Sequence, residues 1–224
     1  METPEPWGRP RREPFFQAPW PAVALVALIL ACYLLELALG ADQVVQRWAL
    51  VPASLDKGRL APLVTAIFLH GSWAHVLANA GFILAFGAPV SRRMGTGPLG
   101  ALAYFTFFLV CGVIGNLVFW ATHPSGVDGA VGASGAGSAL MAAASRLLTG
   151  GPRLAPLLSQ PVIVMAAVFL VANVIIGVVG WAPGAGSARV AWEVHLGGYA
   201  AGLVLFAPTL ALLGRLEGSE PITA

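Results

Sequence analysis

Charged side chains are scarce in this chain of 224 residues: they make up 10% of it, whereas 58% of the residues are hydrophobic. A water-soluble globular domain carries roughly a quarter charged residues. The net charge is only +2, and no cluster of Arg and Lys interleaved with aromatic residues occurs. The chain thus lacks the basic surface typical of nucleic-acid-binding proteins. We expect a protein that lies mainly in lipid and has no nucleic-acid partner.

Cysteine and metal-binding motifs are also scarce. The only two cysteines, Cys32 and Cys111, fall inside separate apolar runs, so buried free thiols are expected rather than a disulfide. The zinc-protease motif H-E-x-x-H is missing, as is any set of Cys, His and carboxylate residues at metal-ligand spacing. We therefore expect no metal and no other cofactor.

Long apolar runs are what the sequence has in abundance. Crossing a bilayer as a helix takes about 20 mostly apolar residues, and the chain has no internal repeat or separate soluble domain beside such runs. The sequence predicts an all-α, polytopic membrane protein with six spans: Pro21–Leu39, Trp73–Val90, Gly100–Trp120, Gly132–Leu148, Val162–Val179 and Ala191–Leu213.

The distribution of Arg and Lys predicts how these spans are oriented. Six spans place both termini on one side, so we expect an N-terminal tail (1–20), a membrane domain (21–213) and a C-terminal tail (214–224). The terminal side carries eight basic residues: Arg9, Arg11, Arg12, Arg92, Arg93, Arg146, Arg153 and Arg215. The opposite side carries four, namely Arg47, Lys57, Arg59 and Arg189. The positive-inside rule therefore predicts a multi-pass protein of the cell (inner) membrane with cytoplasmic termini.

Four polar side chains lie where lipid would disfavour them, and each is a functional candidate for that reason. His75 and Asn79 are four residues apart, so they share one face of the second span. Ser134 and His195 begin the fourth and sixth spans. Because these three spans run in the same direction, the four side chains are expected at one depth near the outer surface.

Other polar residues are interpreted as structural. Glu36 near the outer end of the first span can reach the interface, and His123 lies in a loop where water can reach it. Asn116 and Ser138 are expected to form hydrogen bonds between helices, and Asn173 is assigned to the inner half of the fifth span.

A serine, histidines and an amide at one depth suit acyl transfer. Histidine is the usual base that removes the proton of a serine nucleophile, and backbone N–H groups, Asn or His can stabilise the oxyanion. Glu193 is two residues from His195 and would point to the other side of a helix, so a dyad is predicted rather than a triad. The nucleophile elbow G-x-S-x-G of soluble hydrolases is absent, because Ala136 occupies its last position. Spacing alone leaves a proton-coupled transporter open as an alternative.

The order of these motifs resembles the rhomboid intramembrane serine proteases. The resembling residues are His75-x-x-x-Asn79, Gly132-x-Ser134-Gly135 and His195-x-x-Gly198-x-x-x-Gly202, within a similarity that runs from about Trp48 to Phe206. The resemblance implies a bundle of six transmembrane helices that cleaves transmembrane protein substrates near their outer end.

The same resemblance implies roles for individual residues. Ser134 would be the nucleophile and His195 the general base. His75 and Asn79 would form the oxyanion hole together with the backbone N–H of Ser134. Structural support of the site would come from a further set of residues: Gly132, Gly135, Gly198, Gly202 and His70.

One departure concerns what holds the base. Many bacterial relatives have a tyrosine four residues after the serine, against which the histidine ring stacks, but this chain has Ser138 there. Ser138 or Tyr199 could take its place. Some relatives have lost catalytic residues and only bind membrane proteins, so a catalytically silent client-binding protein is the alternative function.

Overall fold

The computed structural model describes residues 18–149, 151, 153–179 and 190–216. Residues 180–189, which join the predicted fifth and sixth spans, and most of the two predicted tails lie outside these residues. The described part is helical and holds no β-strand; Leu50 and Ala130 form an isolated antiparallel bridge. Its helices are α1 (Trp20–Leu39), α2 (Ala41–Trp48), α3 (Pro52–Leu55), α4 (Pro62–Thr65), the 3₁₀ turn η1 (Ala66–Phe68), α5 (Trp73–Met94), α6 (Pro98–Thr122), α7 (Ser134–Ser145), α8 (Gln160–Val179) and α9 (Trp192–Leu216).

Five of the described helices, α1, α5, α6, α8 and α9, are long and apolar enough to cross a membrane. They coincide with five of the six predicted spans, with ends that differ by a few residues. The third span begins at Pro98 rather than Gly100, because proline fits the first turn of a helix, where its missing N–H costs nothing. The predicted all-α, polytopic membrane architecture is thereby confirmed.

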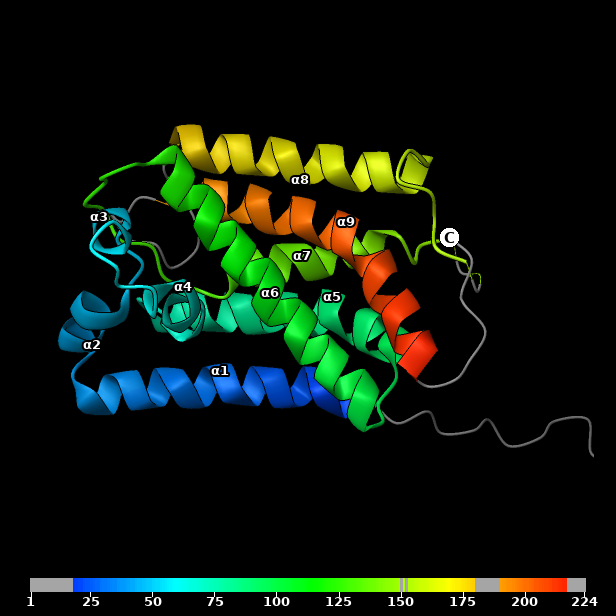
Figure 1. The fold of residues 1–224 in the computed structure, drawn as a ribbon, viewed down its shortest axis with the longest axis horizontal. Coiled ribbons are helices and arrows are strands. Elements are labelled where there is room, and N and C mark those ends of the chain that lie inside the picture. The colour runs from blue at the N-terminus through cyan, green and yellow to red at the C-terminus, as the bar shows by residue number, and fades with distance from the viewer. Residues whose placement is uncertain (1–17, 150, 152, 180–189, 217–224) are drawn as a thin grey trace, which may run out of the picture.

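The remaining predicted span is shorter than expected. Instead of Gly132–Leu148, the helix α7 covers Ser134–Ser145, about 18 Å at 1.5 Å per residue. It cannot begin at Gly132, whose φ of 124° lies outside the helical region. Every residue of α7 after Ser134 is buried, and the helix lies in the middle of the bundle (Figure 1). Its Gly, Ala and Ser residues suit this position, because small side chains let neighbouring backbones approach closely.

The long helices form two sides around this centre. In Figure 1, α1 and α8 run along opposite sides, α5, α7 and α9 lie between them, and α6 crosses the bundle diagonally. The start of α1 and the end of α9 lie at the same end of the molecule. The indole N–H of Trp20 donates to the carbonyl oxygen of Thr96 (2.8 Å) and so ties the start of α1 to the turn between α5 and α6.

The connection between α1 and α5 covers the opposite end of the bundle. Its short helices α2, α3 and α4 gather there (Figure 1), and α2 has no buried residue, as a segment resting in the membrane interface requires. Thr65 donates to the carbonyl oxygen of Trp48 (2.9 Å). The amide of Asn116 on α6 donates to the carbonyl oxygen of Leu63 (2.8 Å). These bonds fix the connection above the starts of the helices that carry the site.

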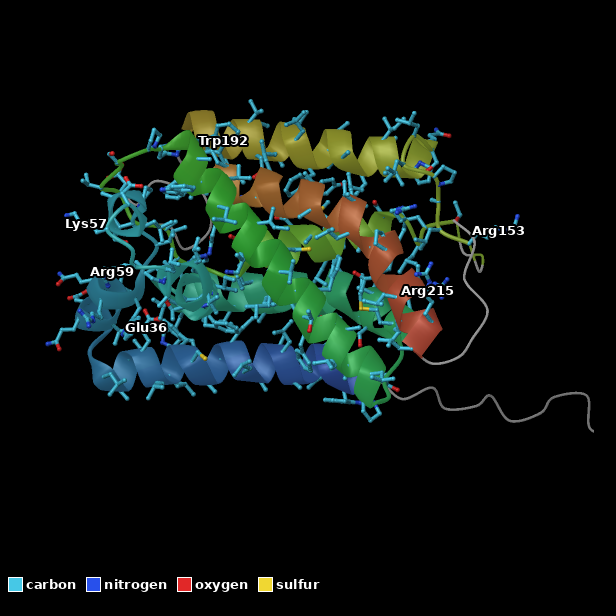
Figure 2. The ribbon with its side chains drawn as sticks, in the orientation of Figure 1. Glu36, Lys57, Arg59, Arg153, Trp192 and Arg215 are labelled. Atoms are coloured by element: carbon cyan, nitrogen blue, oxygen red, sulfur yellow. The ribbon has the colours of Figure 1, made fainter. Side chains whose placement is uncertain are left out.

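Basic side chains separate between the two ends. Lys57 and Arg59 lie beside α2 and α3, whereas Arg153 and Arg215 lie at the opposite end (Figure 2). At this second end the guanidinium of Arg146, just after α7, donates to the carbonyl oxygen of Ala155 (3.1 Å). Basic side chains of the described residues thus lie at both ends of the bundle (Figure 2), and the orientation stays a prediction from the sequence.

Candidate active site

The side chains of Ser134 and His195 meet between α7 and α9. Ser134 is the first residue of α7, and His195 lies in the first turn of α9. The Oγ atom of Ser134 is 2.8 Å from Nε2 of His195. Both residues are only half-buried, so small molecules can reach the pair. An alcohol in hydrogen-bond contact with an imidazole is the arrangement in which a base can activate a nucleophile.

Glycines on α9 set the distance between these two helices. A methyl group at Gly198 would overlap the carbonyl oxygen of Gly135, and one at Gly202 would overlap the carbonyl oxygen of Ala139. The two backbones therefore touch directly, which only residues without a Cβ allow. This contact lies one turn from the Ser134–His195 pair and holds it together.

His75 and Asn79 reach the same place from α5. The helix begins after Ser72, whose hydroxyl accepts the backbone N–H of His75 (3.1 Å) as an N-cap. A Cβ at Gly132 would lie 2.8 Å from the His75 ring and 3.6 Å from the side-chain nitrogen of Asn79. Both polar groups thus face the backbone two residues before Ser134.

The backbone entering α7 offers hydrogen-bond donors at this point. Gly132 itself is held by a hydrogen bond from its N–H to the carbonyl oxygen of Ala66 (2.8 Å). As the first residue of the helix, Ser134 has an N–H group that no carbonyl within α7 can accept, and the helix dipole favours negative charge there. The side-chain nitrogen of Asn79 is buried and makes no hydrogen bond within the described structure. Together these donors could hold an oxyanion.

His70 does not contact Ser134 but lies behind His75. The two imidazole rings meet edge to face, with centroids 5.1 Å apart. The backbone N–H of His70 donates to Oε2 of Glu36 (2.9 Å). Glu36 was expected to reach the interface, and this was wrong: it is 2% exposed, because the connection between α1 and α5 folds over the end of α1.

The buried position of His70 predicts an acid-sensitive fold. Burial, reinforced by the neighbouring His75, lowers the pKa of His70 to about 4. Between about pH 6.5, the ordinary value, and pH 4 the unfolded chain therefore binds more protons than the folded one. The free energy of unfolding should fall as the pH falls through this window, by up to about 3 kcal/mol.

Thermal unfolding of the protein in detergent between pH 4 and 7.5 measures this effect. His70→Phe should flatten the acid-side fall. A wild-type unfolding midpoint that does not change with pH would contradict the prediction.

The second nitrogen of the His195 ring has a partner that was not predicted. Its Nδ1 lies 2.8 Å from Oδ1 of Asn173 on α8. Asn173 was assigned to the inner half of its span, but this contact places it at the depth of His195. The direction of the fifth span could have predicted this depth. In the predicted orientation that span runs from the inner to the outer side, and Asn173 lies only six residues, or about 9 Å, before the end of α8, which is in its outer half.

Three other expectations about polar residues need correction. Ser138 does not bond between helices: its hydroxyl donates to the carbonyl oxygen of Ser134 in its own helix (2.8 Å). Tyr199 stacks on Phe169, with ring centroids 4.3 Å apart, and not on His195. His123 is not simply solvated, because its Nε2 lies 3.5 Å from Oε1 of Glu193.

No group of three or more His, Cys, Asp or Glu residues suited to a metal ion occurs among the described residues. Cys32 and Cys111 are both free thiols. An apolar groove of about 380 Å³ lies between α6 and α9, lined by residues such as Leu99, Leu102 and Leu212. It includes none of the polar residues around Ser134, so the chemistry of the site rests on the side chains and backbone described above.

Comparisons with known proteins agree on one family. A family model described as the Rhomboid domain matches residues 57–211. RHOMBOID-like protein 5 of Arabidopsis thaliana is 32% identical over 96 residues, which are 42% of this chain and 29% of that relative. The chain thus covers less than a third of the relative's length, while the family model covers more than half of the chain and includes α5 to most of α9.

Proposed function

The chain belongs to the rhomboid family, and from this premise we propose that it is an intramembrane serine endopeptidase. Its substrates would be membrane proteins, cut in a transmembrane segment near the outer end. The observation that carries the proposal is the contact of 2.8 Å between Ser134 Oγ and His195 Nε2. A pair of this kind has the geometry of a nucleophile and its base.

The proposed reaction begins with attack of Ser134 Oγ on the carbonyl carbon of the scissile peptide bond, while His195 Nε2 takes the hydroxyl proton. His195 then gives this proton to the leaving amine as the C–N bond breaks, which leaves an acyl-enzyme. Water, deprotonated by His195, attacks the ester carbon. Release of the acid returns the proton to Ser134 and restores the dyad.

Negative charge on the carbonyl oxygen would be stabilised by an oxyanion hole. We assign to it the side chains of His75 and Asn79 and the backbone N–H of Ser134. The buried Asn79 nitrogen, which lacks a partner in the described structure, supports this assignment, because an oxyanion would supply the missing acceptor. Gly132 would leave room for the substrate carbonyl beside these donors, and His70 would support His75 from behind.

The site would open to the outside of the cell membrane, with both termini in the cytoplasm. Lys57 and Arg59 lie at the end of the bundle near α2 and α3, and Arg153 and Arg215 lie at the opposite end (Figure 2). The larger number of Arg and Lys residues that the sequence assigns to the side of the termini favours this orientation. Substrates would enter sideways from the bilayer, past α8. A peptide bond inside a helix is shielded, so small or helix-breaking residues near the cut should favour cleavage.

The direct test is cleavage of a panel of single-span proteins in liposomes, with the cut site mapped. The wild-type protein should cut at least one substrate within its transmembrane segment, and Ser134→Ala should cut none while it unfolds at the same temperature. Persistent cleavage by folded Ser134→Ala would falsify the proposal.

A fluorophosphonate probe separates the protease from its alternative, a catalytically silent client-binding protein. Such probes form a covalent bond only with an activated serine. Labelling of the wild type that disappears in Ser134→Ala supports the protease. Absence of labelling and cleavage, with membrane proteins still bound, would establish the silent binding protein instead.

A further inference from the structure

The imidazole of His195 is held from both sides. Its Nε2 faces Ser134 on α7, and its Nδ1 faces the side-chain oxygen of Asn173 on α8, each at 2.8 Å. Asn173 is 3% exposed, so no bulk water competes for this bond. Three helices therefore meet through one ring.

The orientation of the Asn173 amide follows from its second hydrogen bond. Its Nδ2 donates to the carbonyl oxygen of Phe169, one turn earlier on α8 (2.8 Å). The nitrogen is thereby directed to α8 itself, and the oxygen is left to face His195. An amide oxygen only accepts hydrogen bonds, so the ring must carry its hydrogen on Nδ1. The lone pair of Nε2 is then free to accept the Ser134 hydroxyl.

Other side chains near His195 that could accept a hydrogen bond from its Nδ1 make contacts elsewhere. Glu193 Oε1 lies near His123, and the Ser138 hydroxyl donates to the backbone of α7. The Tyr199 ring stacks on Phe169, which places it beside the Asn173 turn. Within the described residues, Asn173 supplies the hydrogen bond to Nδ1.

We propose that Asn173 is the positioning residue of the base, which holds His195 in the tautomer and ring orientation that Ser134 needs. The proposal rests on the proposed protease function and adds a third member to its dyad. This role for Asn173 also makes the orientation of His195 depend on α8. That helix is loosely packed: 17% of the residues in its most apolar stretch are buried inside the protein, compared with 44% in α9. The base is then correctly set only while α8 is packed against α9.

Two substitutions separate positioning from packing. Asn173→Leu keeps the branched shape of the side chain but removes the acceptor. It should lower kcat by about 10- to 100-fold, the cost typical of losing the partner that orients a metal-bound histidine, with little change in KM. Asn173→Asp keeps an acceptor oxygen and should stay within about tenfold of the wild type. A merely structural role predicts the reverse order, because a buried carboxylate is costly and leucine packs well. Val174, the next residue on α8, is exposed. Val174→Ala is therefore the matched control and should cleave like the wild type.

The tautomer can be measured without any activity. The chain has only four histidines, so ring-¹⁵N NMR in detergent at neutral pH can resolve them, with the His195 signals assigned by their loss in His195→Ala. Wild type should show a protonated Nδ1 and an unprotonated Nε2, and Asn173→Leu should show a mixture of tautomers. A wild-type His195 protonated on Nε2, or a fully active Asn173→Leu, would overturn the proposal. If wild type shows the expected tautomer yet neither cleaves nor labels, the protease function fails while the positioning of the ring stands.

Discussion

Replacing His195 with alanine is expected to lower the rate of substrate cleavage by at least about 10⁴-fold. The expectation follows from the geometry of the pair: Ser134 has one imidazole at 2.8 Å, and a serine hydroxyl without a base is a poor nucleophile at neutral pH. In a soluble serine protease, loss of the serine or the histidine alone lowers kcat by about 10⁶-fold. Both members act as one unit, so the double variant with Ser134→Ala should be no worse than either single one.

The measurement is single-turnover cleavage in liposomes together with the rate of fluorophosphonate labelling. The His195→Ala substitution would leave Oδ1 of the buried Asn173 without its partner, which costs about 1–3 kcal/mol of stability, so the rates should be compared at a temperature at which both proteins are folded. His123 follows the end of α6 and contacts Glu193. His123→Ala is the matched control for loss of an imidazole and should keep at least a third of the wild-type rate. If His195→Ala cleaved at a tenth of the wild-type rate, the assignment of the base would be wrong.

Gly198→Ala is expected to reduce cleavage by about 100-fold or more although its added methyl group never touches Ser134. The methyl group would overlap the carbonyl oxygen of Gly135, so α9 must move away from α7. His195 lies one turn earlier on α9 and would move with it, which stretches the bond to Ser134. Misplacement of a catalytic group by about 1 Å can cost about 100-fold in rate, and the overpacking itself costs about 1–3 kcal/mol of stability.

A second glycine provides the control for the general effect of adding a methyl group to a helix. A Cβ at Gly81 on α5 would meet no atom within 4 Å, so Gly81→Ala should keep full activity and unfold at the same or a higher temperature. Measured side by side, the two variants separate helix propensity from helix contact. Equal activity of Gly198→Ala and Gly81→Ala would show that the close approach of α7 and α9 does not matter.

The folded chain shows why part of the candidate site could be found in the sequence. Polar residues are costly in lipid, so His75, Ser134 and His195 stood out from their surroundings, and the common direction of their helices placed them at one depth. This topology and the glycines at 198 and 202 account for the approach of the two helices that carry Ser134 and His195. The catalytic roles of these residues remain predictions until cleavage is measured.

What could not be found depends on how the helices rotate and on what covers their ends. Asn173 looks like an ordinary interhelical amide in the sequence, and only the rotation of α8 aims its oxygen at His195. Glu36 lies near the end of a span, where long charged side chains usually reach water, but the α1–α5 connection closes over it. The length of α7 was also overestimated at both ends, because Gly132 has a non-helical φ and the pair Leu147 and Leu148 follows Arg146 outside the helix.

If the protein is the proposed protease, the shortness of α7 also bears on where a substrate would be cut. A hydrocarbon core is about 30 Å thick, and twelve residues of helix cover only about 18 Å of it. If Ser145, at the C-terminal end of α7, lies at the inner boundary of the hydrocarbon core, then Ser134, at its N-terminal end, lies about 12 Å below the outer boundary. By its length alone, α7 would then favour a peptide bond roughly eight residues inside the substrate's own span.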